Sequence, residues 1–225
     1  MRRMIFLLLA ILACAIGLRA AEADSLDFKL LAAETYSLDM FYSSELQRMY
    51  VQLDFDIPKS ALSPDYRYGA FLDADAVFQS IEVAGNYENH YRVKNLEPEN
   101  FAPPQPQAAW LDEKAPARFF GLPLGDWQSL PQKVHFRFWY YTSVDPFTTD
   151  SRGVASTGLE PDRFWYPRNT GAASTVQLKL TTTPYMVLRI GENSVTRTDS
   201  QYSRVHETTF TENPAEPVAL RLIRD

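Results

Sequence analysis

The sequence predicts an all-β fold, an antiparallel β-sandwich, on two observations. First, apolar and polar residues alternate along seven segments, which is the pattern of strands that bury one face and expose the other. These segments cover residues 49–57, 77–83, 134–142, 176–180, 186–190, 204–210 and 218–223. Second, the 15 prolines interrupt most stretches in which a long amphipathic helix could begin. Short strands with turn residues between them are typical of a sandwich.

The first of these segments has the clearest strand pattern. Every second residue from Met49 to Ile57 is apolar, and the segment ends at Pro58, which has no backbone N–H to donate. Two turn-forming sequences lie between strand-like runs, Ala84-Gly85-Asn86 and Gly191-Glu192-Asn193. Each of them predicts a β-hairpin.

Residues 97–131 differ from the rest of the chain because they are rich in proline and have no regular period. We expect a long irregular excursion across the sandwich, and not a linker between domains. Four aromatic residues supply apolar anchors that such a segment would bury. They are Trp110, Phe119, Phe120 and Trp127.

The first 23 residues have the order of a secretory signal peptide: two arginines, an apolar run over residues 5–16, and small residues ending in Ala21-Glu22-Ala23. The run is too short for a transmembrane helix. We expect export, with residues 24–225 forming a single β-sandwich domain. Cys14 is the only cysteine and allows a less favoured alternative, a lipid anchor. The lack of glycosylation sequons and of other cysteines favours a bacterial periplasm.

The chain carries a formal net charge of −6. An acidic domain has no general attraction to nucleic-acid phosphates or to anionic lipid, so we expect neither as a partner. No phosphate-binding loop, dinucleotide fingerprint or nucleophile elbow occurs.

The histidines give little indication of catalysis. His90 and His135 lie in strand-like runs, where a histidine is more often packed or solvated than a ligand. His206 begins the sequence HETTF, but Phe210 stands where a zinc motif needs its second histidine, which excludes that motif. Asp73 and Asp75 offer too few oxygens for calcium, and a solvated loop is the preferred interpretation. We therefore expect no catalytic residue, metal or cofactor. An enzyme would require His135 or His206 to converge with carboxylates in a pocket.

A resemblance to a known family begins at residues 162–169, DRFWYPRN. The Trp-Tyr-Pro at 165–167, the strand from Val176, the turn at 183–185 and Gly191-Glu192 follow in the order seen in the amino-terminal β-domain of aminopeptidase N-like zinc peptidases, the gluzincins that include leukotriene hydrolase. The sequence resembles that domain over about residues 70–223. The resemblance implies a β-sandwich that packs against a catalytic domain in the full enzymes.

The catalytic half of that family is missing from this sequence. Neither His-Glu-x-x-His nor the Gly-x-Met-Glu-Asn loop occurs, and the sequence ends at Asp225. The resemblance therefore implies a non-catalytic module, with an accessory or protein-binding role toward a separately encoded protein, such as a peptidase.

The candidate binding surface is predicted from the aromatic residues of DRFWYPRN. In an extended chain Phe164 and Tyr166 face one way and Trp165 the other, and we expect at least one of these faces in the core. Trp165, with Arg163 and Arg168, is the candidate partner surface, because exposed aromatic and arginine side chains are typical of interface hot spots.

An alternative function is a sandwich that binds a carbohydrate or peptide ligand. In that case Trp139, Tyr141 or Trp165 would form a stacking platform. Ligand identity, partner identity and oligomeric state have no signal in the sequence.

Overall fold

The computed structural model describes residues 28–87, 90–95, 99–100, 117–122, 124, 128, 130–160, 163, 165–167, 171–214 and 216–224. Apart from one short 3-10 helix, η1 (Lys59–Ala61), every regular element in these residues is a β-strand. The predicted all-β fold is confirmed. None of the described residues forms a helix long and apolar enough to cross a membrane. The signal peptide, Cys14 and Asp24 lie outside the described residues.

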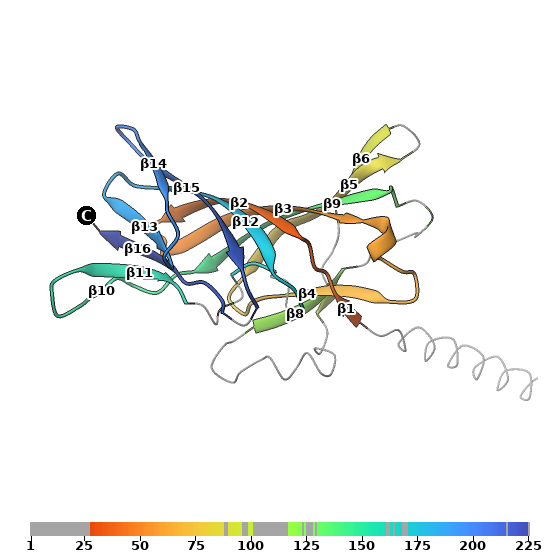
Figure 1. Cartoon of the computed structure of the whole chain (residues 1–225), viewed down its shortest axis with the longest axis horizontal. Coiled ribbons are helices and arrows are strands. Elements are labelled where there is room, and N and C mark those ends of the chain that lie inside the picture. The colour runs from red at the N-terminus through yellow and green to blue at the C-terminus, as the bar shows by residue number, and fades with distance from the viewer. Residues whose placement is uncertain are drawn as a thin grey trace, which may run out of the picture.

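The strands form three sheets (Figure 1). The large sheet has the order β14-β15-β12-β2-β3-β9-β5-β6, and the two small sheets have the orders β1-β4-β8-β7 and β10-β11-β16-β13. The large sheet contains β2 (Thr35–Ser43), β3 (Arg48–Pro58), β5 (Val77–Tyr87), β6 (His90–Asn95), β9 (Lys133–Ser143), β12 (Ser174–Thr182), β14 (Thr196–Asp199) and β15 (Arg204–Glu212). The first small sheet contains β1 (Phe28–Leu30), β4 (Arg67–Asp73), β7 (Glu99–Asn100) and β8 (Ala117–Leu122). The second contains β10 (Thr148–Thr149), β11 (Ala155–Leu159), β13 (Met186–Ile190) and β16 (Leu220–Arg224).

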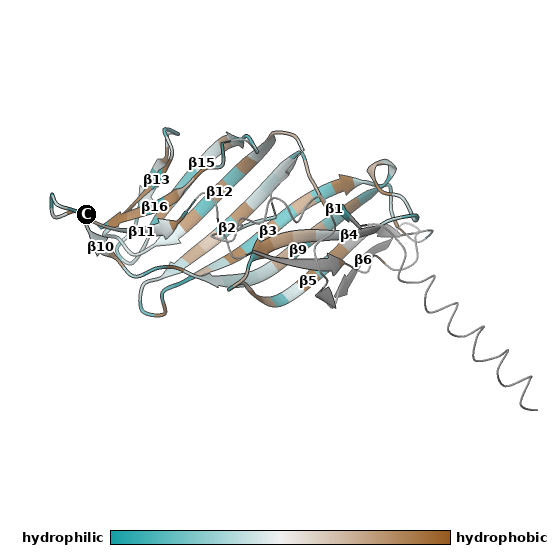
Figure 2. Cartoon of the chain, turned by 90° about the horizontal axis from the view of Figure 1, so that it is seen from below, coloured by the Kyte–Doolittle hydropathy of each residue, from teal (hydrophilic) through white to brown (hydrophobic). Residues whose placement is uncertain are grey.

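Both small sheets lie on the same side of the large sheet, so the core forms between the large sheet and the two small ones (Figure 1). The large sheet is mixed, because β12 pairs with β2 in parallel, whereas the other pairings within it are antiparallel. Figure 2 shows its central strands side by side, with apolar and polar residues alternating along each. We call the face toward the small sheets the inner face and the opposite face the outer face.

The alternation predicted for residues 49–57 determines which face of β3 is buried. Every second residue of β3 is buried, and its partners on β9 are buried in the same register. Phe55 stacks on Phe136 with ring centroids 5.1 Å apart, and Phe138 meets Phe55 edge-on at 5.3 Å. Each buried ring of this kind contributes on the order of 2–3 kcal/mol through burial. The inner face is therefore the apolar half of the sheet.

The other predicted strands are present as well, as β5, β9, β12, β13, β15 and β16. One long strand was missed, β2, although Tyr36, Leu38, Met40 and Tyr42 alternate as regularly as the apolar residues of β3. The pattern was available in the sequence.

The two hairpin predictions need correction. β5 and β6 do pair as neighbouring antiparallel strands, but residues 84–86 belong to β5 and pair with β6, so they are not the turn. Gly191 does turn the chain, with a φ of 49°. The strand after it, β14, nevertheless pairs with β15, while β13 pairs with β16. The turn therefore carries the chain from one sheet to the other.

Part of the proline-rich excursion is regular structure, contrary to the prediction. Residues 117–122 form β8, which pairs with β4 over six residues, so part of the excursion is a strand of the first small sheet. Phe119 and Phe120 lie in this strand, whereas Trp110 and Trp127 lie outside the described residues.

Candidate functional site on the outer face of the large sheet

Trp165 was predicted to face a partner, and the structure shows this prediction to be wrong. Trp165 and Tyr166 are each 1% exposed, and their rings meet edge-on with centroids 4.7 Å apart. The chain bends at both residues and does not run as a strand, so side chains that follow one another are not directed to opposite faces. The Tyr140 hydroxyl donates to the Trp165 carbonyl at 2.7 Å. This segment fills the core.

Arg163 is also part of the interior. Its guanidinium forms an ion pair with the fully buried Asp73, and Thr142 donates to the same carboxylate at 3.1 Å. The solvated-loop interpretation therefore fails for Asp73, although it fits the exposed Asp75. The burial of Asp73 required a partner 90 residues away, which no local pattern reveals. Arg168 and Phe164 lie outside the described residues.

The two other predicted surface aromatics, Trp139 and Tyr141, are on the outer face of β9. Trp139 is 42% exposed and Tyr141 is half-buried. Tyr141 lies opposite Tyr50 of β3, which in turn lies opposite Phe41 of β2. Ring centroids are 5.6 Å apart for Tyr141 and Tyr50 and 6.2 Å apart for Tyr50 and Phe41. We call Phe41, Tyr50 and Tyr141 the aromatic row.

The aromatic row is packed against an arginine and is partly open to solvent. The Arg48 guanidinium lies over the Tyr141 ring, 4.4 Å from its centroid, a cation–π contact that contributes about 0.5–1 kcal/mol near a surface. Phe41 is 50% exposed at one end of the row, and the exposed Val77 lies opposite Tyr141 at the other end. The planes of neighbouring rings are inclined by 40° and 48°, so the row is not a flat platform.

Three connections between strands lie beside the aromatic row: the β2–β3 and β14–β15 connections are hairpins, and the connection after β12 leads to β13 in the second small sheet. Neighbouring strands here follow the order β15-β12-β2-β3. Thr182 pairs with Arg204, and Thr181 pairs with Phe41. The connections after β2, after β12 and before β15 therefore lie at the same end of these strands. Each connection presents a large exposed apolar or aromatic side chain. These are Leu46, Tyr185 and Tyr202. We call these three residues the loop edge.

A ladder of charges lies on β3 and β9, at the end of these strands away from the aromatic row. His135 of β9 has one ring nitrogen 2.8 Å from Asp56 and the other 3.0 Å from Asp54, both on β3. Arg137 donates to Asp54 at 2.7 Å, and Lys133 pairs with Asp56 at 2.6 Å. The structure thus brings His135 together with two carboxylates, as the enzyme alternative required, but each ring nitrogen already has a carboxylate partner.

The pKa of Asp56 reflects these neighbours. Partial burial would raise the pKa of this carboxyl, but hydrogen bonds from Lys133 and His135 outweigh burial and lower it. The charged carboxylate is therefore the form that the ladder stabilises.

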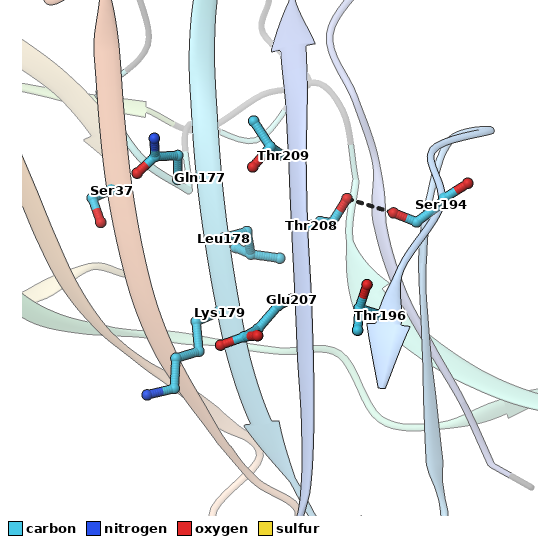
Figure 3. A pocket seen from close by; sticks show the side chains of 9 residues that line it. All are labelled: Ser37, Gln177, Leu178, Lys179, Ser194, Thr196, Glu207, Thr208 and Thr209. Carbon is cyan, nitrogen blue, oxygen red and sulfur yellow. Dashed lines mark hydrogen bonds between the residues drawn. The ribbon is translucent and has the colours of Figure 1, made fainter. Parts of the chain in front are cut away.

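Two clefts lie on the outer face. One, of about 660 Å³, is bounded by charged residues of β3 and β9 and also by apolar residues, among them Ala33, Phe55, Pro58 and Ala61. The second, of about 450 Å³, extends to β14 and β15 (Figure 3). Ser37 and Gln177 line both clefts, so the two adjoin. We call the two clefts together the trough.

Two titratable groups lie on the buried face of β15. Burial, together with repulsion from Arg204 and Arg197, lowers the pKa of His206 to about 4. Burial raises the pKa of Glu212 to about 7, against the stabilising backbone hydrogen bond from Val218. His206 lies 3.3 Å from the Thr182 hydroxyl. In the part of the chain that the structure describes, no group of three or more His, Cys, Asp or Glu side chains is placed to hold a metal ion.

The fold is similar to the amino-terminal region of solved zinc peptidases, which confirms the predicted resemblance at the level of the fold. Leukotriene A4 hydrolase from Saccharomyces cerevisiae superposes with a TM-score of 0.54 at 10% identity, over 85% of this chain and 29% of the hydrolase. The yeast enzyme in complex with bestatin gives a TM-score of 0.52 at 11% identity, over 85% and 28%. An M1 zinc metallopeptidase from Deinococcus radiodurans matches with a TM-score of 0.48 at 13% identity, over 85% and 41%, too low to carry an argument.

These similarities concern the fold alone. This chain spans less than a third of the length of the yeast hydrolase. No family model matches the sequence, and no curated protein matches it.

Proposed function

We propose that this domain is an exported binding module without catalytic activity of its own, which recognises a separate protein partner through the aromatic row. The observation that supports this proposal is an exposed aromatic and arginine surface on the solvent side of the large sheet. Phe41, Tyr50 and Tyr141 are held there although the inner face offers a core in which rings are fully buried.

The composition of this surface matches that of interface hot spots. Tyrosine, tryptophan and arginine are enriched among the residues whose loss weakens protein complexes most. Tyr50, Tyr141 and Arg48 pack against one another, so little side-chain entropy is left to lose on binding. The loop edge extends the surface with Tyr185 and Tyr202, which are 70% and 82% exposed. Large exposed apolar surface of this kind is typical of an interaction site.

The similarity to peptidase amino-terminal regions suggests a class of partner. A domain of this fold is part of the longer chain of leukotriene A4 hydrolase from Saccharomyces cerevisiae, and the sequence itself resembles the amino-terminal domain of zinc peptidases. We propose a separately encoded peptidase as the partner. The proposal of export rests on residues 1–23, which have the order of a signal peptide.

Site-specific photo-crosslinking in the producing cells tests the interface. With a benzoylphenylalanine at position 41, we expect a discrete adduct in the exported fraction, which mass spectrometry then identifies. Tyr141→Ala in the same chain should reduce the adduct at least tenfold, because it removes the ring that supports Tyr50 and Arg48. Circular dichroism of the purified variant checks that it folds.

A matched control uses position 154, where a valine is exposed on the turn between β10 and β11. Equal adducts at positions 41 and 154, or no adduct at position 41, would contradict the proposed interface. Recovery of the protein only from the cytoplasm would contradict export. Chelator-sensitive hydrolysis of aminoacyl nitroanilides by the purified chain would contradict the absence of catalytic activity.

A further inference from the structure

We infer that the free side of β15 is a binding site for an extended peptide. The peptide adds to the large sheet as a strand in line with β14 and presents a basic side chain to Glu207. β15 has nine residues and ends at Glu212, whereas β14 has four and pairs with β15 only as far as Glu207. Within the described ranges, no strand pairs with this side of β15 beyond Glu207. We call this side of residues 208–212 the open edge. It is separate from the aromatic row, and the inference does not depend on the interface proposed there.

The backbone of the open edge directs hydrogen-bonding groups toward the place where β14 would continue. The Ser200 N–H donates to the Ser203 carbonyl at 2.8 Å, which closes the hairpin between β14 and β15. In an antiparallel pair, the N–H and C=O of successive residues point alternately to one side of the strand and to the other. Counting in steps of two from Ser203, Thr209 and Thr211 direct their N–H and C=O groups away from β12, to the side of β14.

These backbone groups are accessible to a partner. Thr209 and Thr211 are exposed, and no described residue outside the strands forms a backbone hydrogen bond with either. The segment before β14 leaves the edge toward the inner side, where the Thr208 hydroxyl donates to the Ser194 carbonyl at 2.8 Å (Figure 3). β15 pairs with β12 in unbroken register and contains no proline, so neither a bulge nor a missing N–H blocks a further strand. An edge of this kind is a template for strand addition.

A carboxylate without an ion pair lies where the open edge begins. Glu207 is exposed on the outer face and lines the smaller cleft of the trough. Lys179 is opposite Glu207, but its ammonium lies 3.6 Å from Asp39 and is directed away from the Glu207 carboxylate (Figure 3). Two acids thus share one base at this point of the described surface. The local charge favours a cationic ligand and disfavours an acidic peptide.

A basic side chain on an added strand reaches this carboxylate. The peptide residue opposite Thr209 directs its side chain to the outer face, because directly opposite residues of an antiparallel pair share a face. Glu207 is then its diagonal neighbour at ~7–8 Å, a separation that a long side chain spans. The smaller cleft, of about 450 Å³, provides space for this side chain beside Thr196 and Thr209. The backbone of the peptide supplies affinity, and the basic side chain supplies selectivity.

Two model peptides test the inference on the purified chain, acetyl-VKVKV-amide and its acidic counterpart acetyl-VEVEV-amide. In NMR titrations at low ionic strength, we expect the lysine peptide to bind about tenfold more tightly, because its charge is attracted and that of the glutamate peptide is repelled. Bound peptide should slow hydrogen exchange of the Thr209 and Thr211 amides about tenfold. The Thr208 and Phe210 amides point to β12 and should change less than about twofold.

Two substitutions test the charge at the edge. Glu207→Gln should weaken binding of the lysine peptide about fivefold, the upper range for an exposed ion pair. Glu45→Gln is the matched control, because it removes the same charge from an exposed residue of the β2–β3 connection and should leave affinity within about twofold. Tyr141→Ala should also leave it unchanged, since the aromatic row is a separate surface. Thermal melts verify that each variant folds.

Methylated peptides test strand addition itself. The lysine residues of the probe pair with Thr209 and Thr211, so their N–H groups face β15. Methylation of either lysine N–H should weaken binding about tenfold, because a backbone hydrogen bond is lost. Methylation of the central valine N–H, which points to solvent, should leave affinity within about threefold.

Four results would overturn the inference. The first is the failure of both peptides to bind at about 5 mM, a concentration that reveals weak affinity. The second is equal weakening by lysine and valine methylation, and the third is an affinity for the lysine peptide that Glu207→Gln leaves unchanged. The fourth is protection of the Thr209 and Thr211 amides in the free protein that disappears on dilution, which would assign the open edge to a second copy of the chain. The crosslink at position 41 is measured independently, so the two proposals can fail separately.

Discussion

The two faces of the large sheet are built from the same strands but serve different purposes. Along β9 the inner residues Phe136, Phe138 and Tyr140 are buried, whereas the outer residues include His135 and the exposed Trp139. The inner face holds the core together. The outer face carries the charge ladder, the trough and the aromatic row, none of which a stable core requires. Residues that add little to stability are therefore the better candidates for binding.

The largest expected difference between the faces comes from the same substitution at two tryptophans. Trp165→Ala removes a fully buried ring that packs on Tyr166 and should lower the free energy of unfolding by about 4 kcal/mol. Trp139→Ala, on the outer face, should cost less than about 1 kcal/mol. Urea denaturation measures both values. Equal losses would mean that Trp139 is also part of the core.

A second test uses the pH dependence of stability. Glu212 keeps its proton up to a pKa of about 7 when folded but releases it at about 4.5 when unfolded, so unfolding releases a proton between these values. The stabilisation from this group is therefore fully present below pH 4.5. It is lost as the pH rises through about 7, which lowers the free energy of unfolding by about 3 kcal/mol. Glu212→Gln should remove this loss, measured as the difference from wild type by urea denaturation at pH 5 and pH 8.

His206 acts in the opposite direction, because its folded pKa of about 4 lies below the ordinary 6.5. Its contribution to stability is complete above pH 6.5 and is lost as pH falls toward 4.

Glu207→Gln is the matched control for the Glu212 prediction, since Glu207 lies on the exposed side of the same strand and its substitution should change stability by less than ~0.5 kcal/mol. A wild-type and Glu212→Gln difference that stays constant from pH 5 to pH 8 would refute the assignment.

The smallest effect is expected in the charge ladder. Lys133 is largely exposed, and its ion pair with Asp56 should stabilise the fold by no more than ~0.5 kcal/mol. Lys133→Ala should therefore leave the urea midpoint almost unchanged at 0.15 M salt, where surface charges are screened within ~8 Å. A loss above ~2 kcal/mol would show that the ladder is a structural element of the sheet.

The strands were largely predictable because a strand with one buried face leaves a period of two in its own residues. That is why β3, β9 and β15 were expected, and why β2 could have been. The short strands β10 and β14 are exposed along their whole length, so no alternation marks them.

The candidate site was only half predictable for the same reason. Trp139 and Tyr141 could be selected as outer-face aromatics from the pattern of β9 alone. Phe41 and Tyr50 lie in line with Tyr141 only because of the register of β2 with β3 and of β3 with β9. The aromatic row is a property of three strands, and no one strand contains it.

The segment DRFWYPRN shows where local sequence stops being informative. Its aromatic composition made it conspicuous, but Trp165 is buried because Tyr140 and Asp73, from strands distant in the chain, hold Trp165 and Arg163 in place. Alternating hydrophobicity determines that strands form and which of their faces is buried, because both depend on neighbouring residues. Tertiary structure alone decides which side chains meet, because sheet order and register bring together residues that share no local pattern.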